Sequence, residues 1–199
     1  MSQQIETRID VTLTERNRLS ALFRIILVVP MMIFLSSFTP MNLSSLETDY
    51  LAIGFLVIPV ALSLVFRQIY PSYLLSFNQA FLSLSTRVDA YIFLLSDEYP
   101  SIEENKVVSL TFPPVDAMTL NRWLPLIKWF LAIPLYVVGV FYAIYAFFFL
   151  SIFAWLSILF TGNYPEKCAE GVVGTIAFWN RTLGYSILLV TDEYPSFSL

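Results

Sequence analysis

The longest apolar run in the sequence restricts the fold more than any other feature. It covers residues 123–161 and carries a single charge, Lys128. As one helix it would be about 58 Å long, whereas the hydrocarbon core of a bilayer is about 30 Å thick. A single tilted helix does not absorb that excess. The run therefore predicts two short spans joined by a tight turn near residues 141–148.

Two further apolar runs, residues 19–38 and 51–69, enclose a polar loop at residues 39–50. Charged residues make up only 13% of the chain, about half of what a soluble globular protein carries. We therefore predict an all-α membrane protein with four transmembrane helices, arranged as two tandem helical hairpins.

The sequence contains an internal repeat. Asn17, Arg18, Arg24 and Pro30 recur 104 positions later as Asn121, Arg122, Lys128 and Pro134. Tyr70 and Arg87 recur 94 positions later as Tyr164 and Arg181, and Asp97 recurs 95 positions later as Asp192. The fall in offset means that the second hairpin lacks the polar loop. The repeat predicts two units, residues 1–105 and 106–199, related by an axis along the membrane normal.

Each unit also has elements outside its hairpin. Residues 8–13 and 107–112 are short β-prone runs, and we predict that they pair as a small two-stranded cytoplasmic β ribbon. Residues 74–95 repeat apolar side chains every three or four positions, and residues 169–190 do so more loosely. As a span, the first would place Arg87 and Asp89 near hydrocarbon, at about 2.5–3.5 kcal/mol each. Both are predicted to be interfacial helices, with a deeper re-entrant position left open.

The distribution of charge and the scarcity of histidine and cysteine limit the orientations, partners and ligands that we expect. In the four-span arrangement the 11 Lys and Arg residues lie at or near one side, which predicts cytoplasmic N and C termini. The net charge of −4 does not indicate a nucleic-acid partner. The chain has no histidine and one cysteine, so we expect no metal site, no haem ligand and no cofactor.

The second half carries a recognisable pattern. It consists of Asn121, Arg122, Lys128 and Pro134, then Phe-Thr-Gly-Asn-Tyr-Pro at residues 160–165, then Arg181, Tyr185 and Asp-Glu-Tyr-Pro at residues 192–195. This pattern resembles a family of small prokaryotic multi-pass membrane proteins known only as domain of unknown function 4389. In the first half, the segment that corresponds to Thr-Gly-Asn-Tyr-Pro at residues 161–165 is Arg67-Gln68-Ile69-Tyr70-Pro71, which lacks the Thr-Gly pair. The resemblance implies two tandem copies and a prokaryotic cytoplasmic (inner) membrane, and it implies no activity.

The Asp-Glu-Tyr-Pro motif is the best-defined candidate site. Its two copies are Asp97, Glu98, Tyr99 and Pro100, and Asp192, Glu193, Tyr194 and Pro195. Around the axis, the four acids would bind a cation or a basic partner. Alternatively, proline ends the preceding helix and tyrosine anchors at the membrane interface, and we favour this structural interpretation.

Arg24 and Lys128 lie one to two turns inside their predicted spans. They either contact an anionic lipid headgroup or simply extend to the surface, as long basic side chains commonly do. Cys168 is either a palmitoylation site or a small packing residue. The turn at residues 162–165 lacks the second glycine and the lysine of a phosphate-binding loop.

The predicted spans contain no acid, histidine or paired charge at mid-membrane depth, where such groups mark proton and ion pathways. We therefore predict a protein without enzymatic activity, an accessory or scaffold subunit of a larger membrane protein complex. The alternative is a lipid-binding or transport protein that acts as a homo-oligomer. Either way, the expected partners are membrane lipids and other membrane subunits or further copies of the chain.

Overall fold

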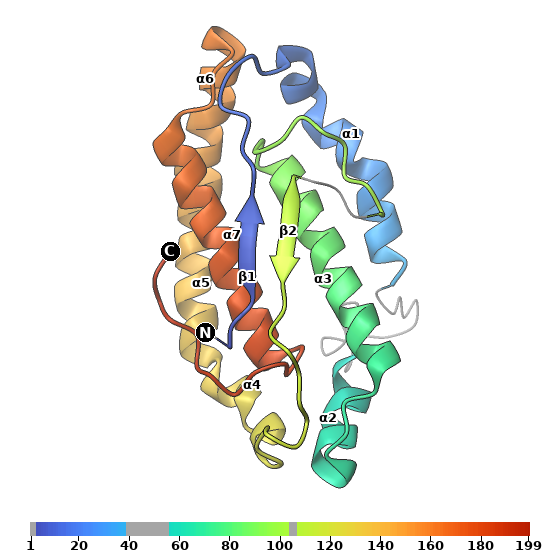
Figure 1. The fold of residues 1–199 in the computed structure, drawn as a ribbon. Helices are drawn as coiled ribbons and strands as arrows, with labels where there is room; N and C mark the ends of the chain where they lie inside the picture. The colour runs from blue at the N-terminus through green and yellow to red at the C-terminus, as the bar shows by residue number, and fades with distance from the viewer. Residues whose placement is uncertain (1–2, 39–55, 104–106) are drawn as a thin grey trace, which may run out of the picture.

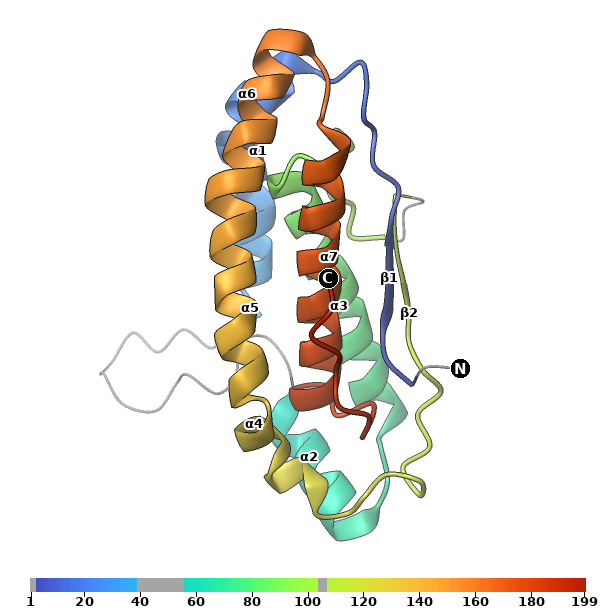
Figure 2. The same ribbon diagram turned by 90° about the vertical axis from the view of Figure 1, so that its left-hand side faces the viewer.

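The computed structural model describes residues 3–38, 56–103 and 107–199, and its elements form three layers (Figures 1 and 2). The elements, in chain order, are β1 (Glu6–Ile9), α1 (Arg18–Ser36), α2 (Val57–Arg67), α3 (Ser72–Ile92), β2 (Val108–Thr111), η2 (Leu124–Leu126), α4 (Lys128–Leu131), α5 (Ile133–Tyr145), η3 (Ala146–Ser151), α6 (Ile152–Thr161) and α7 (Glu166–Ser186). Helices α1, α5 and α6 form one outer layer, α3 and α7 the middle layer, and β1 with β2 the other outer layer.

The β ribbon is confirmed. Strands β1 and β2 pair antiparallel, with Glu6 opposite Thr111 and Ile9 opposite Val108. The first strand begins two residues earlier than the predicted run, because Ile5 and Ile9 both turn their side chains inward and are buried. Beyond Ile9 one further hydrogen bond, from Asp10 N to Val107 O at 2.8 Å, closes the ribbon.

The predicted turn near residues 141–148 is wrong. Helices α5 and α6 and the π-helical segment η3 between them form one continuous helix, Ile133–Thr161, of 29 residues. Residues 140–151 contain no glycine, proline, asparagine or aspartate to reverse the chain. The π segment widens the helix instead, and Ser151 Oγ donates to Ala146 O at 2.8 Å. The rest of the apolar run is separated from α5 by a helix break before Pro134.

Two helices, Arg18–Ser36 and Ile133–Thr161, are long and apolar enough to cross a membrane. The second run of the first predicted hairpin forms α2, whose 11 residues span only about 16 Å. Residues 39–55, which include the predicted polar loop, lie outside the described part of the chain. The described residues thus provide two candidate spans in place of the predicted four.

The predicted amphipathic helices are α3 and α7, each of 21 residues. They do not lie at the edge of the fold, because the ribbon covers one side of the pair and the apolar helices cover the other (Figure 2). Their polar side chains bond within the protein. Asn180 Nδ2 donates to Thr7 Oγ1 at 2.9 Å, and Asn180 Oδ1 lies 3.2 Å from Thr86 Oγ1.

Helices α5 and α7 approach each other closely at Gly139. A Cβ atom at this position would lie 2.9 Å from Trp179 Cζ2 and 3.0 Å from Phe178 Cε1. We expect Gly139→Val to lower the free energy of unfolding by about 1–3 kcal/mol, because the two helices must separate. Denaturant unfolding in detergent micelles measures this effect. Val140→Ile, at the exposed neighbouring position, is the control, and equal stability of both variants would contradict the close contact.

Candidate functional site

Arg24 joins the start of α1 to the segment that follows α3. Its side chain is 4% exposed, and Nη2 lies 2.6 Å from Asp97 Oδ1. Nη1 donates to Ser96 O at 2.6 Å, and the guanidinium stacks 4.0 Å from the centre of the Tyr91 ring. A buried arginine that binds a carboxylate and a carbonyl and stacks on an aromatic ring fixes the geometry of its surroundings.

Lys128 makes the corresponding contacts in the second half of the chain. Its side chain is 1% exposed, and Nζ lies 2.7 Å from Asp192 Oδ1. Nζ also donates to Thr191 O at 2.6 Å and lies 5.1 Å from the centre of the Tyr185 ring. Burial lowers the pKa of the ammonium group, and Asp192 opposes that effect through its hydrogen bond and its charge.

The second oxygen of each aspartate binds a backbone amide. Asp97 Oδ2 accepts from Asn17 N at 2.9 Å, and Asp192 Oδ2 accepts from Asn121 N at 2.6 Å. Each carboxylate therefore ties the segment after the middle-layer helix to the start of the apolar helical run in its own half. We call the two groups the Asp97 cluster and the Asp192 cluster.

The aromatic residues of the motif complete the clusters. Tyr99 meets Tyr91 edge to face, with ring centres 5.6 Å apart, and Tyr194 meets Tyr185 in the same way at 5.5 Å. Edge-to-face pairs of this geometry contribute about 0.5–1.5 kcal/mol beyond their buried area. The tyrosines of the motif thus pack against the helix that precedes them.

Two reciprocal hydrogen bonds connect the halves. Tyr70 Oη donates to Leu188 O at 2.7 Å, and Tyr164 Oη donates to Phe93 O at 3.1 Å. The accepting carbonyls lie where the chain leaves α7 and α3. At the next residue, Leu189 and Leu94 adopt left-handed backbone angles with φ of 59° and 63°. This conformation is strained for leucine and persists only where surrounding contacts enforce it.

Arg16 distinguishes the Asp97 cluster from the Asp192 cluster. Its buried guanidinium lies 3.1 Å from Asp97 Oδ1, and it donates to the carbonyls of Thr12, Leu94 and Leu95. The position 104 residues later is Leu120. The Asp97 carboxylate therefore balances two cations, whereas Asp192 balances one.

The geometry of the two clusters bears on the roles predicted for Arg24 and Lys128. Arg24 and Lys128 are buried, so the interpretation that they extend to the surface is wrong. Contact of either side chain with a lipid headgroup stays a prediction, and the structure gives both an internal partner. Glu98 and Glu193 are the outer members of their motifs: Glu98 is exposed, and Glu193 Oε2 accepts from Gln3 N at 2.8 Å. In the described part of the chain, no three His, Cys, Asp or Glu residues are grouped to hold a metal ion.

A groove of about 390 Å³ lies between α1, α3 and α7. Its lining is mainly apolar, and Asp89, Ser36, Ser85 and Asn180 are its polar members, with Trp179 beside them. A second hollow of about 290 Å³, between α1, η3 and α6, shares Ile92 with the first. We refer to the two hollows together as the α1 groove. No feature of the sequence predicted this groove; the one related signal was the cost of placing Asp89 near hydrocarbon.

Asp89 is the charged residue of the 390 Å³ section. Its side chain is exposed at the groove, and desolvation by the apolar groups around it raises its pKa to about 6. The folded state therefore disfavours the ionised carboxyl, and the stability associated with the neutral form is lost as the pH rises from about 4 to about 6.

This pKa predicts the effect of a neutral replacement. In lipid-free detergent micelles at pH 7.5, Asp89→Asn is expected to raise the melting temperature by several degrees. At pH 4.5, where the wild-type carboxyl is protonated, the two proteins should melt together. Thermal unfolding at both pH values is the measurement, and a gain of the same size at pH 4.5 would rule out ionisation as the cause.

Comparison with known proteins adds one match. A family model described as a domain of unknown function (DUF4389) matches residues 123–198. That range contains Lys128, Tyr185 and Asp192 of the Asp192 cluster, and the helices α4 to α7. No curated protein and no solved structure matches the chain.

Proposed function

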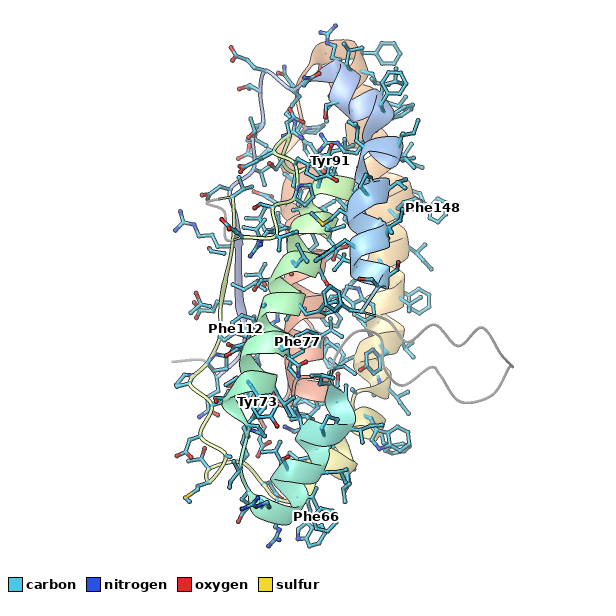
Figure 3. The ribbon with its side chains drawn as sticks, turned by 90° about the vertical axis from the view of Figure 1, so that its right-hand side faces the viewer. Phe66, Tyr73, Phe77, Tyr91, Phe112 and Phe148 are labelled. Atoms are coloured by element: carbon cyan, nitrogen blue, oxygen red, sulfur yellow. The ribbon has the colours of Figure 1, made fainter. Side chains whose placement is uncertain are left out.

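We propose that this protein is a non-catalytic accessory or scaffold subunit of a membrane complex, held in one leaflet by its layer of apolar helices. The observation that carries the proposal is that more than half of the exposed large apolar side chains lie on one layer, formed by α1 and Ile133–Thr161. Large apolar side chains are exposed along that layer, among them Phe23, Ile25, Ile26 and Ile33 on α1 and Val137, Phe141, Phe148, Phe149, Phe153 and Phe160 along Ile133–Thr161. Phe148 projects away from the ribbon (Figure 3). A surface of this kind marks contact with a membrane or a partner.

The ribbon argues for an orientation parallel to the membrane. It runs alongside the long helices at mid-height (Figure 2). If Ile133–Thr161 crossed the bilayer, the ribbon would lie in hydrocarbon with the backbone groups of its outer edges unpaired. The charged side chains of Arg8 and Asp10, which are 81% and 62% exposed, would then also face hydrocarbon. Unpaired backbone groups cost several kcal/mol each in lipid. With the helices lying in the interface and the ribbon in water, this cost disappears.

We further propose that residues 1–105 and 106–199 are two copies of one unit. The matching Asp97 and Asp192 clusters, the reciprocal bonds of Tyr70 and Tyr164 and the antiparallel ribbon support an approximate twofold axis through the layers. With the helices in the membrane plane, this axis follows the membrane normal. The ribbon side would face the cytoplasm of a prokaryotic cell, with the N-terminus on it (Figure 2).

The non-catalytic role is supported by the contacts of the buried charged side chains. The buried cations and the two aspartates of the clusters hold segments of the fold together, so these groups are already engaged. The exposed face of the ribbon, with Glu6, Arg8 and Asp10, is the surface that a partner in water would meet.

Extraction of the native protein in a mild detergent, followed by mass spectrometry of bound proteins, tests the scaffold role. We expect defined partners at constant stoichiometry, and we expect Arg8→Glu to reduce their recovery while Lys167→Glu, outside the ribbon, does not. Recovery of the chain alone in its native membrane extract would contradict the scaffold role. It would favour the second candidate, a lipid-binding protein, for which the α1 groove is the specific observation.

A further inference from the structure

We propose that the α1 groove binds a membrane phospholipid whose headgroup carries an ammonium group, with the ammonium at Asp89 and an acyl chain between α1 and η3. This inference rests on the membrane embedding proposed above. It assigns a ligand to a groove that the scaffold role does not use.

The charge of Asp89 has no counter-charge within the described part of the chain. Among the described residues, its carboxyl forms no ion pair and accepts no hydrogen bond, whereas Asp97 and Asp192 each meet a buried cation within 2.7 Å. The other residues that line its section of the groove carry no charge. An unpaired carboxylate in an apolar groove is complementary to a cationic ligand.

The surroundings favour an ammonium group over a metal ion. Calcium takes six to eight oxygen ligands, and magnesium requires near-octahedral coordination by oxygen. The groove offers one carboxylate with the side chains of Ser85, Ser36 and Asn180, and Asn180 is already bonded to Thr7 and Thr86. Trp179 lines the same section, and an indole ring attracts ammonium groups through its π face.

The second section of the groove suits an acyl chain. Apart from Arg24 and Ser151, its lining is apolar, and it lies between α1 and the π-helical segment. Ile25 and Ile152 on its rim are 82% and 44% exposed on the layer that faces the membrane. Ile92 lines both this section and the Asp89 section, and we place one lipid across them. π-helical segments are frequent at functional sites.

Competition between two lipids tests the proposal. The full-length protein is purified in detergent with equal amounts of phosphatidylethanolamine and phosphatidylglycerol of identical chains, and native mass spectrometry counts the retained lipid. We expect about a tenfold preference for phosphatidylethanolamine, the ratio expected from one added charge-assisted hydrogen bond. Asp89→Asn should abolish the preference. Glu98→Gln, which neutralises an exposed acid outside the groove, should preserve it.

A second variant tests the chain-binding section. Ile152→Trp fills the groove from its rim without altering a buried residue, so it should reduce retention of both lipids while Asp89→Asn removes only the preference. The inference is overturned if the wild type retains the two lipids in their input ratio, or if Asp89→Asn keeps the preference. Flotation with vesicles separates this result from failure of the embedding: wild-type protein that does not float refutes the embedding, and protein that floats without a lipid preference refutes the groove ligand alone.

Discussion

Replacement of Asp97 by asparagine is expected to lower the free energy of unfolding by about 3–5 kcal/mol, the usual consequence of removing one partner from a buried ion pair. The change leaves the guanidinium groups of Arg16 and Arg24, which are 0% and 4% exposed, without a counter-charge. Arginine does not lose its proton in proteins, so neither charge can be relieved by deprotonation. The asparagine oxygen can still accept from Asn17 N, but its amide nitrogen then faces the two guanidinium groups, so the charge and the hydrogen bond to Oδ1 are lost together.

Asp192→Asn is the matched variant in the second half of the chain. It leaves only Lys128 unpaired, and burial already lowers the pKa of that ammonium. The variant should therefore lose less stability than Asp97→Asn at pH 7. As the pH rises toward 10, Lys128 becomes neutral in the folded state before it does so in the unfolded chain. The loss of unfolding free energy caused by Asp192→Asn should therefore become smaller.

Denaturant unfolding in micelles at pH 7 and pH 10 measures both effects. Glu98→Gln, one position after Asp97, is the control and should change stability by less than about 0.5 kcal/mol. The account of the clusters is contradicted if Asp97→Asn recovers at high pH as Asp192→Asn does, or if Asp192→Asn is the more damaging of the two.

The second large effect concerns the membrane. Phe148 is 57% exposed at the middle of the long helix. We expect Phe148→Asp to weaken vesicle binding by at least about 100-fold, because it removes about 1.5–3 kcal/mol of apolar burial and places a charge in the interface. Co-flotation with vesicles measures the effect. Ser109→Asp, on the exposed side of the ribbon, adds the same charge and should leave binding unchanged, whereas equal loss in both variants would contradict a one-sided attachment.

The sequence predicted the local elements well. Alternating apolar residues marked the ribbon, and the spacing of apolar residues marked α3 and α7, because both patterns reflect burial within one element. The ion pairs were missed although their residues were singled out. Each residue had a sufficient local explanation: Arg24 as a long basic side chain that extends to the membrane surface, and Asp97 as part of a motif that ends a helix. Only their shared place in the repeat, matched by Lys128 and Asp192, indicated that they belong together.

The path of the long apolar run was not predictable from its composition. Hydropathy reports that residues 123–161 avoid water, but it does not report whether they reverse direction. The excess length over one bilayer suggested a turn, whereas the chain breaks before Pro134 and then continues as a single helix. If the helix lies in the membrane plane, as we propose, the thickness of the bilayer does not limit its length and no turn is needed.

Labels at different positions along Ile133–Thr161 test the embedding most directly. Single cysteines replace the exposed residues Ile133, Val140, Phe148 and Phe160 in a Cys168→Ala background, and each carries a fluorophore whose depth in vesicles is measured with lipid-attached quenchers. The account predicts similar depths for all four labels, just below the headgroups of one leaflet, with a label at Ser109 in water. A depth profile that is shallow at Ile133 and Phe160, on opposite faces of the bilayer, and deepest at Val140 and Phe148 would contradict it and establish a spanning helix.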